Sequence, residues 1–264
     1  MKTLLFSMLS CILGIMGCKE AGKKQQPLVS DTAAVNEKIQ TENITITPIE
    51  HATAVLKWGG TVIYVDPVGG AAAFEGQPDP DLILITDIHG DHLDPATLTA
   101  LNTQKSKIVV PKAVAEKLPA ELNPMVNVLN NGESKKFLDI QIEAIPMYNL
   151  REEAKDFHVK GRGNGYVLEK DGSRIYFSGD TEDIPEMRAL ENIDKAFVCM
   201  NLPYTMTVDS AASAVLDFAP KEVYPYHYRG RPDVSDVGRF KKIVNEGNPD
   251  IEVVQLDWYP KEAY

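Results

Sequence analysis

Cysteine is scarce in this chain of 264 residues, which contains only three. After removal of the leader predicted below, Cys18 and Cys199 are the ones left. They cannot build the disulfide framework that many exported proteins rely on. Packing, together with any bound metal, must therefore supply the stability of the folded part. Cys199 lies inside the apolar run Ala196–Met200, which favours a packed core thiol over a soft metal ligand.

Positive charge is also in short supply. The chain has 27 Lys and Arg against 38 Asp and Glu, a formal net charge of −11, and no basic stripe. A phosphate-rich polymer would meet net repulsion, so we expect no nucleic-acid partner and instead a small-molecule substrate. An acidic balance of this size is also ordinary for a soluble domain. It predicts no particular oligomeric state.

A hydrophobic run long enough to span a membrane is missing. The apolar stretch Thr3–Met16 is shorter than the roughly 20 residues a span needs, and one lysine precedes it. Residues 1–18 therefore read as a signal peptide that is removed. Its ending, Ile15-Met16-Gly17-Cys18, resembles a bacterial lipobox, which implies lipidation of Cys18. The alternative is a chance cysteine in a plain signal peptide.

Residues 19–42 are rich in Lys, Gln, Glu, Ala and Ser and nearly lack aromatic residues. Such a segment cannot bury enough apolar surface to fold, so we expect a flexible tether. Together with the lipobox it predicts an exported, membrane-anchored lipoprotein that faces the periplasm or the cell surface. Residues 43–264 contain no internal linker and form one predicted domain.

Only five histidines occur in the chain, and two of them lie in Thr86–Asp94, the stretch around which the chain is organised. The apolar run Leu82–Ile85 before it predicts a buried strand, and Gly90 permits a tight turn. Imidazole and carboxylate groups gathered there are the donors that a divalent cation accepts. A solvated polar loop is the alternative, and the Asp91-His92 pair argues against it. The candidate ligands in this stretch are Asp87, His89, Asp91 and His92.

Three further candidate ligands follow in order: His158 in a polar segment, Asp180 in Gly179-Asp180-Thr181, and His227 in Pro225-Tyr226-His227-Tyr228. Taken singly, each has a plainer explanation, namely a surface histidine, a helix cap and a core histidine. The ordered set resembles the His-x-His-x-Asp-His signature and later motifs of the metallo-β-lactamase fold superfamily. One departure is Asp87, which stands where that signature has its first histidine.

The resemblance implies an α/β (α+β) fold, a four-layer αββα sandwich with metals between its halves. It implies two divalent ions, zinc first, with manganese or iron as alternatives. Asp87, His89 and His158 would hold one ion, Asp91, His92 and His227 the other, and Asp180 would bridge them.

Weaker matches point to one branch of that superfamily. His51-Ala52-Thr53, Val65–Val68, Tyr148-Asn149 and the segment 161–166 resemble the L-ascorbate 6-phosphate lactonase-like branch. By this resemblance His51, Tyr148, Asn149 and Tyr228 would contact the ligands or the substrate. A purely structural role is the alternative for His51.

Strand and helix patterns agree with two similar halves. Gly59-Gly60 and Asp171-Gly172 predict hairpin turns. Strands are predicted at 44–49, 54–58, 61–65, 82–86, 107–110, 126–129, 137–146, 164–170, 174–178, 196–199, 222–226 and 251–256. Helices are predicted near Pro95 and Pro111 and at 185–192, 209–218 and 234–245.

The function that we predict from these features is metal-dependent hydrolysis of an ester, lactone or phosphodiester-type bond. Two cations lower the pKa of a shared water, and the resulting hydroxide attacks, with Asp91 as proton acceptor. The alternative is a non-catalytic metal- or ligand-binding lipoprotein of the same fold. Loss of the first metal site through Asp87 would lead to it, but retention of the other six ligands argues against it.

Overall fold

The computed structural model describes residues 44–260. The predicted signal peptide, the lipidation site Cys18 and the tether 19–42 lie outside these residues. Within the described part, no helix is long and apolar enough to cross a membrane.

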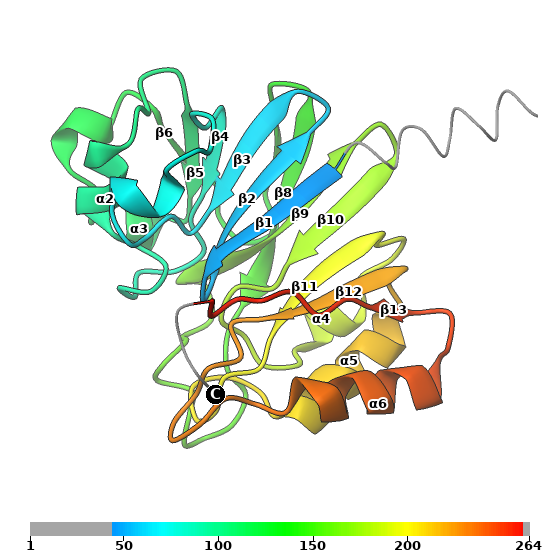
Figure 1. Cartoon of the computed structure of the whole chain (residues 1–264). Helices are drawn as coiled ribbons and strands as arrows, with labels where there is room; N and C mark the ends of the chain where they lie inside the picture. Colours follow the sequence, from blue (N-terminus) through cyan, green and yellow to red (C-terminus); the bar gives the residue numbers. More distant parts are fainter. Residues whose placement is uncertain (1–43, 261–264) are drawn as a thin grey trace, which may run out of the picture. The chain divides into compact units, whose positions relative to one another are not determined.

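Two β-sheets face each other, and their strands follow the order of the chain (Figure 1). The first sheet contains β1 (Ile44–Glu50), β2 (Thr53–Trp58), β3 (Thr61–Val65), β4 (Leu82–Leu84), β5 (Lys107–Val110) and β6 (Val126–Val128). The second contains β7 (Ser134–Phe137), β8 (Ile140–Met147), β9 (Gly163–Lys170), β10 (Ser173–Phe177), β11 (Lys195–Cys199), β12 (Glu222–Tyr226) and β13 (Glu252–Val253).

Each sheet begins with antiparallel strands and continues with parallel ones. In the first sheet β1, β2 and β3 pair antiparallel, whereas β3 to β6 are parallel. In the second, β7 to β10 are antiparallel and β10 to β13 parallel. The carboxyl ends of parallel strands lie at one edge of a sheet, where loops can gather functional side chains.

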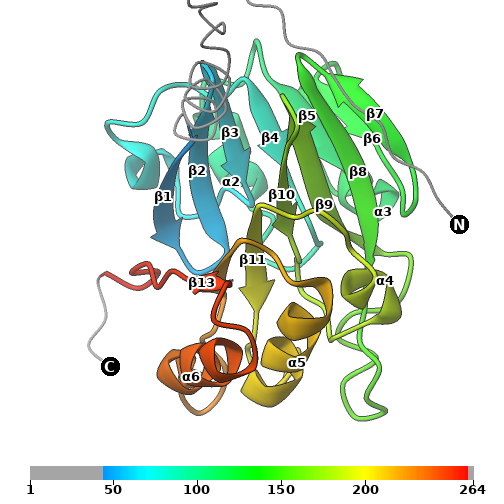
Figure 2. The same ribbon diagram turned by 90° about the vertical axis from the view of Figure 1, so that its right-hand side faces the viewer.

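Helices cover the outer faces of both sheets (Figure 1). The first carries α2 (Pro95–Ala100) and α3 (Lys112–Ala115), with the short 3-10 helices η1 (Ala71–Phe74) and η2 (Ala120–Leu122). Figure 2 shows α4 (Pro185–Arg188), α5 (Val208–Phe218) and α6 (Val237–Gly247) beside the second sheet. These layers confirm the predicted α/β sandwich.

Side chains that alternate along the strands of the first sheet divide the core into two hydrophobic clusters. In β2, Val55 packs with the cluster under α2 and α3, and the next residue, Leu56, packs with the main cluster between the sheets. Side chains on successive residues of a strand point to opposite faces, so one strand serves both layers. Both faces of the first sheet are therefore buried, as the apolar run Leu82–Ile85 predicts.

The predicted strand 137–146 is confirmed from Ile140 onward as part of β8, but its start is wrong. The structure has a hairpin there, β7 and β8, which turns at Leu138 with a left-handed φ of 55°. Leucine is not a usual turn residue, and Asp139 beside it is the one local signal for this turn.

Strand β4 is also shorter than predicted, ending at Leu84 instead of Thr86. The amide of Thr86 leaves the sheet and donates to the carboxylate of Asp66 over 2.7 Å. Helix α6 starts at Val237, three residues later than predicted, because the Asp236 side chain accepts from the amide of Arg239 and caps the helix.

Candidate metal centre

Four candidate ligands lie on the β4–α2 connection. The amides of His92 and Leu93 both donate to the carbonyl of His89, which closes a tight turn around Gly90. Asp94 then caps α2, and its side chain accepts from the Ala96 amide over 3.0 Å. The turn and the cap hold residues 87–92 at the carboxyl end of β4.

The other candidates come from three separate strand ends. Asp180 follows β10, His227 follows β12, and His158 lies on the long loop between β8 and β9. His51 occupies the turn between β1 and β2, and its ring centroid lies 3.9 Å from that of His227. The structure therefore brings together all seven predicted ligands, with His51 beside them.

A first group of donors contains Asp87, His89 and His158. Asp87 Oδ2 lies 2.6 Å from His89 Nδ1 and 3.9 Å from His158 Nε2. His158 Nε2 is in turn 3.1 Å from Asp180 Oδ2. This is the set predicted for one ion, with Asp180 adjacent.

A second group contains His92, His227 and Asp180. Asp180 lies 3.1 Å from His227 Nε2 and 3.4 Å from His92 Nε2. Asp91 approaches His227 to 3.5 Å and is also 3.4 Å from His51 Nε2, so His51, Asp91 and His227 form a third group. The prediction placed Asp91, His92 and His227 together and left His51 out of the ligand set.

These separations suit cations. Donor atoms about 2.0–2.2 Å from one zinc ion lie roughly 3 to 3.5 Å from one another. The distances from Asp180 to three imidazoles fall in this range, and His92 Nε2 and His227 Nε2 face each other over 3.1 Å. Two ring nitrogens so close cannot both carry protons comfortably, whereas a cation between them satisfies both lone pairs. The donor set therefore fits divalent metal.

Asp66 orients one of these rings. Its carboxylate Oδ2 lies 2.8 Å from His92 Nδ1 and also accepts from the Thr86 hydroxyl over 2.6 Å. A carboxylate only accepts, so Nδ1 of the ring carries a proton and donates it to Asp66, which leaves Nε2, on the side of Asp180, as the atom that can bind a cation. Such a contact fixes the tautomer of a ligating histidine.

The pKa shifts among the seven candidate ligands, called the ligand cluster below, agree with this arrangement. Burial alone would raise the pKa of the Asp180 carboxyl, but His227, His92 and His158 hold the pKa well below its ordinary value. For His92, burial lowers the pKa, yet Asp180 and Asp66 raise it well above the ordinary value. Protons thus occupy the place that cations would take, and metal binding must release them.

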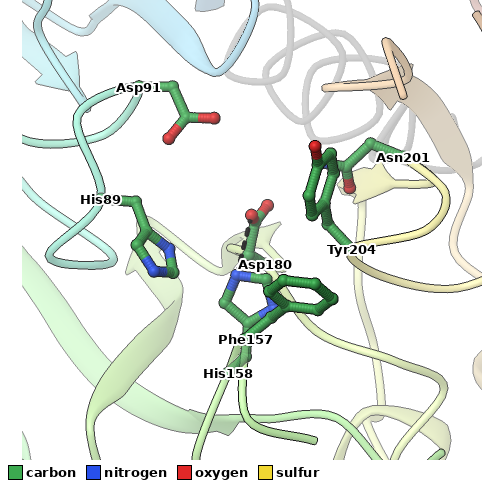
Figure 3. Close-up of a pocket in the computed structure, with 7 residues that line it drawn as sticks. All are labelled: His89, Asp91, Phe157, His158, Asp180, Asn201 and Tyr204. Carbon is green, nitrogen blue, oxygen red and sulfur yellow. Dashed lines mark ion pairs between the residues drawn. The ribbon is translucent and has the colours of Figure 1, made fainter. Parts of the chain in front are cut away.

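A cavity of about 260 Å³ opens beside the cluster (Figure 3). Its lining includes four candidate ligands, His89, Asp91, His158 and Asp180, together with Phe157, Asn201 and Tyr204. Asp91 is the most exposed carboxylate of the cluster, with 41 % of its side chain accessible, whereas Asp87 is fully buried. A substrate entering this cavity therefore meets Asp91 first among the carboxylates.

Comparison with known proteins decides the family. The β-lactamase superfamily domain matches residues 45–227, which carry all seven candidate ligands. The chain belongs to this superfamily. A UPF0173 metal-dependent hydrolase of Thermococcus onnurineus is 33 % identical over 198 residues, covering 71 % of this chain and 87 % of the relative.

Solved structures of similar proteins agree with the superfamily assignment. A candidate metal-dependent hydrolase from Parabacteroides distasonis is 39 % identical with a TM-score of 0.72, and the match covers 80 % of this chain and 92 % of that one. Igni18, a metallo hydrolase of Ignicoccus hospitalis, shares the fold with a TM-score of 0.67 at 23 % identity, covering 81 % and 94 % of the two chains. Membership of the lactonase-like branch stays a prediction.

Three residues that were predicted to contact the ligands or the substrate do not line the cavity. The Tyr148 hydroxyl bonds to Glu186 over 2.9 Å. The Asn149 side chain donates to the carbonyls of Ala154 and Tyr204, and thereby supports the His158 loop. Tyr228 packs edge-on against Tyr259.

Cys199 is buried in the main core cluster, as predicted. Burial raises the pKa of its thiol to about 12, which keeps the sulfur protonated and poorly suited to binding metal.

Sequence analysis missed several residues of the site. Asp66 lies in the segment Val65–Val68, which was used only for the resemblance to the lactonase-like branch. It follows the end of β3, just as candidate ligands follow the ends of β4, β10 and β12. Asn201 likewise follows β11, so its place at a strand end was a usable signal. Tyr259 gave no signal, and its hydroxyl lies 2.8 Å from His51 Nδ1. Phe157 and Tyr204 meet only through folding, with ring centroids 5.2 Å apart.

Proposed function

We propose that this protein is a hydrolase that works with two divalent cations, zinc first, with manganese or iron as alternatives. The observation that carries the proposal is the convergence of seven imidazole and carboxylate groups, Asp180 among them, beside an open cavity. The names of its relatives support metal-dependent hydrolysis. They favour catalysis over the alternative of a binding lipoprotein.

In this proposal Asp87, His89 and His158 hold one cation, and His92 and His227 with Asp91 hold the other. Asp180 lies between the two groups and serves both. Bound cations supply Lewis acidity, which lowers the pKa of a water and polarises the bond to be cut.

Asp91 is the residue of this chain that we propose as proton acceptor. It lines the cavity, is partly exposed, and sits against His51 and His227. Those neighbours position its carboxylate without burying it, so that a proton taken from water can pass to solvent or to the leaving oxygen.

The walls of the cavity favour an uncharged ester or lactone over a phosphodiester. Among the described residues, no Lys or Arg lines the cavity, whereas the rings of Phe157 and Tyr204 do. Two arginines lie beside the lining rather than in it: Arg162 pairs with Asp87 over 3.0 Å, and Arg231 lies over the Tyr204 ring at 6.0 Å. The described lining itself therefore offers a phosphodiester no cationic side chain to hold its charge.

A substrate screen tests this function. Metal-loaded protein is offered a neutral aryl ester, a lactone, a thioester and an aryl phosphodiester, with metal content measured by mass spectrometry. We expect two cations per chain and a higher kcat/KM for the ester or lactone than for the phosphodiester. Hydrolysis of none of them would count against the function, and hydrolysis of the phosphodiester alone would overturn the ester preference.

For location, we propose that the protein is exported and anchored to a membrane through lipid on Cys18, with the domain facing the periplasm or the cell surface. A lipid anchor requires the cysteine at the cleavage site, so Cys18→Ser should release the protein or leave an unprocessed precursor. Fractionation of a bacterial host that processes lipoproteins, with Cys199→Ser as the control, measures this. A wild-type protein that is wholly soluble and unacylated would contradict the proposal.

A further inference from the structure

Arg162 makes a forked contact with the buried candidate ligand Asp87. Its Nε donates to Oδ1 over 3.1 Å and its Nη2 to Oδ2 over 3.0 Å. Asp87 is fully buried and Arg162 is only 19 % exposed, so water screens the pair weakly. The same guanidinium donates to the carbonyl of Phe157 on the loop that carries His158. Arg162 thereby links two segments that supply ligands.

Close packing of the backbone holds this contact in place. A Cβ at Gly163, the first residue of β9, would lie 2.8 Å from the Thr86 carbonyl oxygen, so only glycine fits there. The next residue, Asn164, donates its amide to the same oxygen over 2.9 Å. The start of β9 therefore lies directly against residue 86, which sets Arg162 beside Asp87.

The charges explain why the contact matters. Asp87 and Asp180 both approach Nε2 of His158, at 3.9 Å and 3.1 Å. A buried carboxylate with no cationic partner is costly, and a second one nearby raises the cost. With Arg162 in place, the Asp87 pair has no net charge, as a neutral imidazole would have.

We infer that Arg162 is a positioning residue of the metal centre, which neutralises Asp87 and fixes its carboxylate so that the pair takes the place of a neutral histidine. The inference rests on the proposed metal-dependent function. It follows that Asp87 and Arg162 can be replaced together far more easily than singly. Asp87→His alone leaves a buried guanidinium unpaired beside the cations, and Arg162→Gln alone leaves a buried carboxylate unpaired.

A double-mutant cycle tests this inference, using Arg162→Gln, Asp87→His and the two combined in the full domain. Breaking a buried pair costs several kcal/mol, so each single change should lower the Tm of the metal-free protein by roughly 6–20 °C. The double variant should recover more than half of that loss. Losses that simply add in the double variant would overturn the inference.

Metal affinity gives a second readout, which a merely structural role would not move in this way. Titration with Mn²⁺ should show weaker binding to Asp87→His by about tenfold or more, and recovery in the double variant. Arg162→Gln should bind Mn²⁺ at least as tightly as wild type, because Asp87 then keeps its full charge, although its metal-free form is less stable. Weaker binding by Arg162→Gln would contradict charge compensation.

Arg239→Gln is the matched control. Arg239 also contacts both carboxylate oxygens of Asp209, from its Nη2 at 2.7 and 3.0 Å, but both side chains are mostly exposed. Its loss should shift the Tm by no more than about 3 °C. If Arg162→Gln lowered the Tm by no more than Arg239→Gln does, the Arg162–Asp87 pair would contribute no more than a surface pair. That result would overturn the inference.

Two further cases need separate measurements: variants that do not fold, and protein that binds no metal. If the single variants fail to fold, a folded double variant still supports the inference and an unfolded one overturns it, while Arg162→Lys, which keeps the charge without the fork, should fold and bind Mn²⁺. If wild-type protein binds no Mn²⁺ or Zn²⁺ at all, the proposed function fails. If it binds metal and the cycle is additive, only the role of Arg162 fails.

Discussion

Removal of divalent cations by a chelator is expected to abolish hydrolysis, and added Zn²⁺ or Mn²⁺ is expected to restore it. Apart from the candidate ligands, the cavity is lined by Phe157, Asn201 and Tyr204, and none of these is a strong nucleophile. The attacking water must therefore be activated at the cluster. Loss of the cations removes several kcal/mol of transition-state stabilisation, which corresponds to at least roughly 10³-fold in rate.

The measurement uses an uncharged aryl ester or lactone found in the screen, with metal content checked by mass spectrometry before and after chelation. Circular dichroism of the chelated protein serves as the control for folding, because bound ligands also stabilise the native state. Restoration by Zn²⁺ or Mn²⁺ separates loss of cofactor from damage to the protein. Full activity in protein verified to be free of metal would rule the mechanism out.

Local signals were enough to predict much of the fold. The hairpin turns at Gly59-Gly60 and Asp171-Gly172 are confirmed, because glycine adopts the left-handed backbone conformation that such turns need. The turn at Leu138 was missed for the opposite reason: leucine adopts that conformation there under the constraint of the pairing between β7 and β8. The next residue, Asp139, favours turns, but it has no glycine beside it of the kind that marks the other two hairpins.

The candidate site divides in the same way. His89, Asp91 and His92 lie within one turn, so their convergence is visible in the sequence. Arg162, by contrast, lies 75 residues from Asp87, and Asp66 lies 26 residues from His92. Asp66 and His92 meet because the neighbouring strands β3 and β4 end at the same edge, whereas Arg162 and Asp87 meet because the start of β9 in the second sheet packs against the end of β4 in the first. Order along the chain cannot predict which side chains face each other there.

The family resemblance predicted which residues come together, including the group of Asp87, His89 and His158, but not the membership of the other two groups. His51 was expected only near the site, and the structure places it in a group with Asp91 and His227. Its ring is held from behind by the hydroxyl of Tyr259, a residue close to the C-terminus. Tyr259 thus supports a residue 208 positions earlier in the chain, a relation that only the folded structure reveals.

The second large effect is expected at Asp180, which lies at the centre of the cluster. Its carboxylate contacts His158 and His227 over 3.1 Å and His92 over 3.4 Å, so it touches both candidate metal positions. Asp180→Asn keeps the shape of the side chain but removes its charge, and an amide binds divalent cations far more weakly than a carboxylate. Metal binding at both positions should therefore weaken together.

We expect Asp180→Asn to lower the metal content from two cations towards one or none and to reduce kcat by at least roughly 10²-fold. Asp183→Asn is the matched control: Asp183 lies three residues further along the same loop and pairs with Arg188 over 2.5 Å, away from the cluster. That variant should keep both cations and most of the activity. Metal content and kcat measured on the same samples distinguish the two. If Asp180→Asn kept two cations and full turnover, Asp180 could not be the shared ligand, and each cation would have to be held by its own group alone.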